Sequence, residues 1–171
     1  MKYYLTLLLY FFTICLYSQD TLQVLESPNG NNYAYSRKLT VISKDEQMCA
    51  SFYLDIREKY NYIEAKGIHV SLFNFGDESE DNELIIIFDD NTRIAKISDQ
   101  GYQLGNRDWF YLSENEIVKL ATTEIERIWF MNGMYYDIVD AKLNGMDRSY
   151  FIRVLDMIKK LNIKNTEDAG N

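Results

Sequence analysis

Apolar and polar side chains alternate without a break in Gln47-Met48-Cys49-Ala50-Ser51-Phe52-Tyr53-Leu54-Asp55-Ile56-Arg57. Every second residue from Met48 to Ile56 is apolar, and in an extended chain these residues share one face. An amphipathic helix repeats every three to four residues instead. The segment therefore predicts a β-strand with one face packed against a core.

The same two-residue period recurs along most of the chain. It predicts further strands at Tyr35–Ser43 and Gly67–Phe75, while apolar runs between turn residues predict strands at Leu84–Phe88, Thr92–Ile97, Asp108–Leu112, Glu124–Met131 and Met134–Asp140. The connecting segments are short, as between antiparallel neighbours. Leu84–Phe88 is apolar at every position, so we expect it at the centre of a sheet with both faces covered.

Asn132-Gly133 is the strongest turn signal in the chain. This pair suits the positive φ angles of a type I′ hairpin turn. A two-residue turn here predicts that Met131 lies opposite Met134 and that Trp129 lies opposite Tyr136.

Two helices are expected in the last third. Ser113 and Glu116 have the spacing of a capping box, which predicts a short helix after Ser113. A terminal amphipathic helix is predicted after Asn144-Gly145, capped by Asp147 or Ser149. Its apolar stripe consists of Phe151, Val154, Leu155, Ile158 and Leu161.

These elements predict an α+β fold: a meandering antiparallel sheet of about eight strands, curved or roll-like, with the terminal helix packed on it. The order of elements is similar in outline to pleckstrin-homology-like domains. This likeness concerns architecture and carries no function.

The amino-terminal segment has the composition of a secretory signal peptide. Lys2 precedes fifteen uncharged residues, Tyr3–Tyr17, and a helix of that length rises about 22 Å, short of the roughly 30 Å of membrane hydrocarbon. We therefore expect residues 1–18 to be cleaved and the protein to be exported, periplasmic or secreted, with no stable membrane span. An uncleaved anchor and lipidation of Cys15 are the alternatives.

The rest of the chain predicts one domain. We expect a polar lead-in at residues 19–32, a single globular domain at residues 33–161 and a frayed tail at residues 162–171.

Charge and composition exclude several classes of function. Without residues 1–18 the chain has 17 basic and 26 acidic side chains, a net charge of −9, which opposes nucleic-acid binding. Only Cys49 and His69 remain as soft ligands, too few for a structural zinc site, so we expect no metal and no cofactor. The acidic loop Gly76–Glu83 offers oxygen ligands for Ca²⁺, but it lacks EF-hand spacing and favours a solvated hairpin tip.

No catalytic residue is assigned, because the sequence has no GxSxG, HExxH, CxxC or phosphate-loop motif. Aromatic side chains gather in the last third, where they would suit a protein, glycan or apolar small ligand. These candidate binding residues are Trp109, Tyr111, Trp129, Tyr135 and Tyr136.

The leading hypothesis is a non-enzymatic exported binding module with an apolar patch or groove beside the terminal helix. One alternative is a small hydrolase that uses unmarked carboxylates or His69, the latter either alone or as a dyad with Cys49. The other alternative is a structural envelope component.

Overall fold

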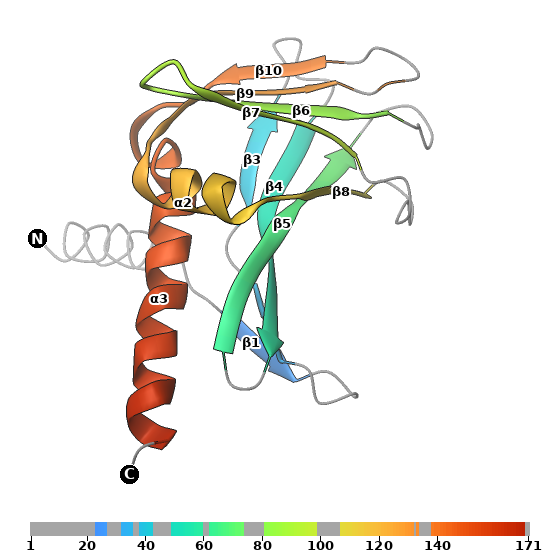
Figure 1. Ribbon diagram of the computed structural model, residues 1–171. Helices are drawn as coiled ribbons and strands as arrows, with labels where there is room; N and C mark the ends of the chain where they lie inside the picture. The colour runs from blue at the N-terminus through green and yellow to red at the C-terminus, as the bar shows by residue number, and fades with distance from the viewer. Residues whose placement is uncertain are drawn as a thin grey trace, which may run out of the picture.

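The computed structural model describes residues 23–26, 32–35, 38–42, 49–59, 62–73, 81–98, 107–131, 133 and 138–169. Ten strands, two α-helices and one 3₁₀ turn lie in these ranges (Figure 1). The strands are β1 (Gln23–Glu26), β2 (Asn32–Tyr35), β3 (Leu39–Ile42), β4 (Cys49–Lys59), β5 (Tyr62–Phe73), β6 (Glu83–Phe88), β7 (Arg93–Ile97), β8 (Arg107–Tyr111), β9 (Ile125–Met131) and β10 (Ile138–Lys142). The helical elements are α2 (Glu114–Thr122), η1 (Gly145–Asp147) and α3 (Tyr150–Ala169). The predicted signal peptide and most of the acidic loop fall outside the described residues.

Eight of the strands form two four-stranded antiparallel sheets. The β5 sheet has the order β3-β4-β5-β8, and the β6 sheet has the order β10-β9-β6-β7. β10 lies beside β3 and β7 lies beside β8, while the strands of the two sheets run crosswise (Figure 1). The predicted α+β fold with antiparallel strands is confirmed. The chain departs from a simple meander where β6 pairs with β9 and β5 pairs with β8.

One hydrophobic core joins the inner faces of the two sheets. Phe110 of the β5 sheet and Phe130 of the β6 sheet meet edge to face, with ring centroids 6.3 Å apart. α3 contributes Phe151 and Val154 to the same core. Full burial of such a side chain stabilises the fold by about 1.5–3 kcal/mol, so the helix and both sheets depend on one another.

β6 lies between β9 and β7, so its predicted central position is confirmed. Leu84 and Ile86 are fully buried on its inner face. Ile85 and Ile87, on the outer face, are only half-buried. The expectation that both faces of this strand are covered was therefore wrong for the outer face.

The predicted register of the last hairpin was wrong. Met131 lies opposite Ile138 rather than Met134, so the loop is longer than the two residues of a type I′ turn. This register places Val139 beside Phe130 in the core. In addition, the Gly133 N–H donates to Asn82 Oδ1 at 2.9 Å. Core packing and this contact replace the tight turn that local preference favours.

Both helices form where they were expected. The Ser113 hydroxyl accepts from Glu116 N–H at 3.4 Å, and Ser113 N–H donates to the Glu116 carboxylate at 2.7 Å, which confirms the capping box of α2. In α3 the apolar stripe from Phe151 to Ile158 is buried. Among the helices in the described ranges, none is long and apolar enough to cross a membrane.

Regular secondary structure lies near both ends of the described chain. β1, within the segment expected to be a polar lead-in, pairs with β2, which begins at the end of that segment. α3 continues beyond Leu161, where a frayed tail was expected, as far as Ala169. One reason is Asn162, whose side chain bonds to β5.

Candidate functional site

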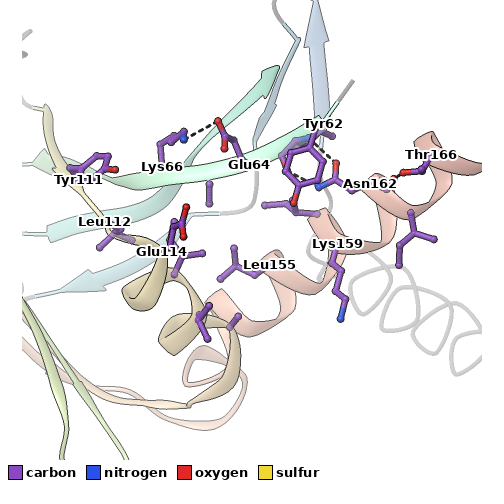
Figure 2. Close-up of a pocket in the computed structure, with 17 residues that line it drawn as sticks. Tyr62, Glu64, Lys66, Tyr111, Leu112, Glu114, Leu155, Lys159, Asn162 and Thr166 are labelled. Carbon is purple, nitrogen blue, oxygen red and sulfur yellow. Dashed lines mark hydrogen bonds and ion pairs between the residues drawn. The ribbon is translucent and has the colours of Figure 1, made fainter. Parts of the chain in front are cut away.

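A groove with a volume of about 690 Å³ opens between β5, α2 and α3. In Figure 2, β5 passes on one side of the groove and the two helices lie on the other. Its lining comes from Tyr62–Lys66 of β5, from Tyr111 at the end of β8 and Leu112 after it, and from facing residues of α2 and α3.

The groove exists because β8 covers only part of β5. β8 pairs with β5 from Ser71 to Gly67, and Leu112 N–H then donates to Lys66 O at 3.0 Å. After Leu112 the chain turns away into α2. The edge of β5 from Tyr62 to Lys66 is thus left without β8 and forms one wall of the groove.

The floor of the groove is apolar. Leu112, Leu155 and Ile158 are buried members of the core. Ile117 and Ala121 of α2 pack against this core while still lining the groove. A ligand in the groove would therefore rest on hydrocarbon supported by the main core of the protein.

Large apolar side chains remain exposed around the rim. Tyr62 is 58% exposed, Tyr111 54%, Val118 60% and Ile163 52%. All four line the groove, although they come from β5, the end of β8, α2 and α3. Apolar side chains scattered singly over a surface need no explanation, but a gathered set around a groove indicates an interaction site.

Asn162 links α3 to β5 across the groove. Its side-chain Nδ2 donates to Ile63 O at 2.7 Å, and its Oδ1 accepts from Ile63 N–H at 2.7 Å (Figure 2). The side-chain amide thus makes the pair of hydrogen bonds that a neighbouring strand would make. These bonds hold α3 against the edge of β5 and fix the width of the groove at this point.

The charged side chains at the groove lie mainly at its edges. Glu64 and Lys66 form an ion pair with an N–O distance of 2.9 Å, and both are partly exposed. Glu114 of α2 and Lys159 of α3 are exposed. A solvent-exposed pair adds little stability, so these groups contribute little to the fold.

The predicted aromatic residues that the structure describes do not form one surface. Trp109 and Tyr111 lie on the outer face of the β5 sheet, with ring centroids 6.1 Å apart in an edge arrangement. Trp129 lies on the outer face of the β6 sheet, because Phe130 beside it faces the core. Of these residues, Tyr111 alone lines the groove. Tyr135 and Tyr136 lie outside the described residues.

The half of β5 that forms the groove was not predicted, since this strand was expected to begin at Gly67 and begins at Tyr62. A β-bulge explains the error: Ile56 lies opposite Ala65, whereas Asp55 lies opposite Gly67. Because β5 has one extra residue at the bulge, its core-facing positions change from odd to even residue numbers. Ile63 and Ala65 face the core before the bulge, and Ile68 faces it afterwards. A two-residue alternation of apolar side chains, sought separately before and after a one-residue shift, would have predicted the longer strand.

The Cys49–His69 dyad is not formed. Cys49 lies opposite Phe73 and His69 lies opposite Tyr53, so four residues of β4, about 13 Å of strand, separate the two positions. His69 Nε2 lies 3.5 Å from Asp55 Oδ1, and the His69 ring stacks on Tyr53 with centroids 5.1 Å apart. His69 thus has structural neighbours on the sheet and lies outside the groove.

The buried carboxyl of Asp108 also lies away from the groove. Burial raises its pKa, while a hydrogen bond from Asn82 Nδ2 opposes that increase. Asn82 is itself bonded to Gly133 and Ser98, so the Asp108–Asn82 pair joins loops at the opposite end of β8. Within the described ranges, no three His, Cys, Asp or Glu side chains are grouped to hold a metal ion.

Comparisons with protein-family models, with curated proteins and with solved structures found no match for this chain. Function is therefore inferred from the geometry of the groove.

Proposed function

We propose that the protein is a non-enzymatic, exported binding module and that its ligand is an apolar group held in the groove between β5, α2 and α3. One observation carries this proposal: four exposed apolar side chains from separate elements surround a groove with an apolar floor. Covering such surface by a ligand is favourable by about 25 cal/mol per Å².

The residues around the groove are held in place by contacts within the protein, which favours a preformed site. The floor belongs to the main core, the capping box fixes the start of α2, and Asn162 ties α3 to β5. A preformed site loses less conformational entropy when a ligand binds. The groove thus favours an apolar peptide segment or small molecule over a glycan, which would need more polar partners.

A dye titration tests this proposal. Anilinonaphthalene sulfonate should bind the natively folded protein saturably, and Val118→Gln should weaken its binding about fivefold because apolar contact area is lost. Val118 is exposed on α2, so the substitution should leave the melting temperature nearly unchanged.

Ile97→Gln is the matched control, because Ile97 is 61% exposed on β7 and does not line the groove. It should bind the dye as the parent does. Equal effects of the two substitutions, or no saturable binding by the parent, would contradict the assignment of the groove as the binding site.

A further inference from the structure

We propose that the occupant of the groove is an extended polypeptide segment, which adds as a short strand to the open edge of β5 between Leu112 and Asn162. This inference rests on the proposed function and names the class of ligand.

The backbone of β5 directs hydrogen-bonding groups away from β4. Ile63 directs both its N–H and its C=O away from β4, to the side chain of Asn162. Peptide groups in a strand alternate in direction, so Ala65, two residues on, directs its N–H and C=O to the same edge. β8 pairing with β5 ends at Gly67, and Leu112 bonds to Lys66. The edge of Ala65 therefore faces the groove.

The edge of β5 already has hydrogen-bonded partners on both sides of Ala65. β8 supplies a strand up to Leu112, and the side-chain amide of Asn162 imitates a peptide group at Ile63. A segment bonded to Ala65 would continue the line of β8 along β5. Three residues of β5, from Glu64 to Lys66, separate the two ends, about 10 Å of strand. Pairing is thus limited to about three ligand residues.

The pairing with β5 would also decide where the side chains of the added segment point. Residues opposite each other in a sheet share a face, so the ligand residue opposite Ala65 would point as Ala65 does, toward the core. There it would meet Ile117 of α2 and Leu155 of α3. Its two neighbours would point to the other face, where Glu64 and Lys66 lie. The preferred sequence therefore has a medium-sized apolar residue between two polar ones.

The charge of the protein indicates which charges the ligand should have. Without residues 1–18 the chain has a net charge of −9, while the groove itself has both signs: Glu64 pairs with Lys66, and Glu114 and Lys159 are exposed. The net charge would attract basic groups at the ends of the segment. A peptide is favoured over a fatty acid because only a peptide has N–H and C=O groups to pair with those that Ala65 directs to the groove.

The probe peptide is acetyl-Lys-Thr-Leu-Thr-Lys-amide, measured by calorimetry against the whole protein. Replacing the central leucine by N-methylleucine removes its N–H and retains the apolar side chain, so binding should weaken at least about tenfold. A glycine at the centre should weaken binding to a similar extent, about tenfold, because it leaves the floor uncovered. Hydrogen exchange of the Ala65 amide should slow when the leucine peptide binds.

Ala65→Pro tests the same contact from the protein side. Proline has no N–H, and at this position it removes a donor directed away from β4, so the ladder between β4 and β5 is spared. Peptide binding should be lost, while the far-ultraviolet circular dichroism spectrum should show that the variant is folded. If this variant does not fold, the comparison with N-methylleucine still decides the question.

Three results would overturn strand addition while leaving the groove as a binding site. These are equal affinity for the N-methylated peptide, dye binding without binding of any peptide, and self-association of the protein that Val118→Gln abolishes. The last two would assign the groove to a small apolar molecule or to a second copy of the chain. Dye binding that is insensitive to Val118→Gln would instead refute the proposed function itself.

Discussion

Among single residues, Gly67 lies at the bulge where β8 stops and the groove begins, and its position leaves no room for a side chain. A Cβ atom placed on Gly67 would lie 2.5 Å from Phe110 O and 2.7 Å from Trp109 Nε1. Both distances are shorter than atoms tolerate, and the Phe110 oxygen belongs to the backbone. Glycine therefore lets β8 and the Trp109 ring approach β5.

We expect Gly67→Ala to destabilise the protein by about 2–4 kcal/mol, because β8 must shift away from β5. Urea denaturation measures this loss. Gly145→Ala is the comparison, since its Cβ would meet nothing within 4 Å, although its φ of 53° adds backbone strain. If Gly67→Ala proves no more destabilising than Gly145→Ala, the close approach of β8 is not the constraint.

The second residue-scale prediction concerns pH. Burial raises the pKa of Asp108 above its ordinary value of 3.8, so the folded chain holds this proton more tightly than the unfolded chain. The contribution of Asp108 to stability is therefore greatest below pH 3.8 and is lost as the pH rises through the raised value.

Asp108→Asn cannot ionise and retains an oxygen that accepts from Asn82. We expect it to be more stable than the parent at about pH 7, with an advantage that shrinks as the pH falls toward 3.8. Urea midpoints across this range measure the difference. A constant difference at every pH would contradict the assigned cause.

At the scale of elements, the contact that positions α3 on β5 is the amide pair of Asn162. Asn162→Ala should lower the free energy of unfolding by about 1–3 kcal/mol, since two hydrogen bonds to Ile63 are lost. Lys159→Ala, at an exposed position three residues earlier, should have little effect. If both substitutions change the urea midpoint equally, the amide pair does not anchor the helix.

Most elements were predictable because their signals are local. The alternation in β4, the capping box of Ser113 and Glu116, and the apolar stripe of α3 all act within a few residues. The register of β9 and β10 was not predictable from Asn132-Gly133, because packing of Val139 and the bond from Gly133 to Asn82 override the local turn preference.

At the scale of the whole molecule, both sheets and α3 share one core. We expect unfolding to be a single transition, with fluorescence and far-ultraviolet circular dichroism giving the same midpoint. Two separate transitions would mean that the β5 sheet and the β6 sheet fold independently.

The site itself was only partly predictable. Proximity to the terminal helix was expected from the two-sided apolar strands, and Tyr111 was named as a candidate. The other rim residues Tyr62, Val118 and Ile163 were not, because each is an ordinary exposed residue within its own element. They become a site only when β5, α2 and α3 meet.

Local patterns in the sequence were enough to predict most strands and both helices, and which side of most of them faces the core, because side-chain periodicity and capping are local properties. Tertiary structure decided where β8 leaves β5, how β10 pairs with β9 and which exposed side chains surround the groove. These features depend on contacts between residues far apart in the chain, whose energies no local pattern records.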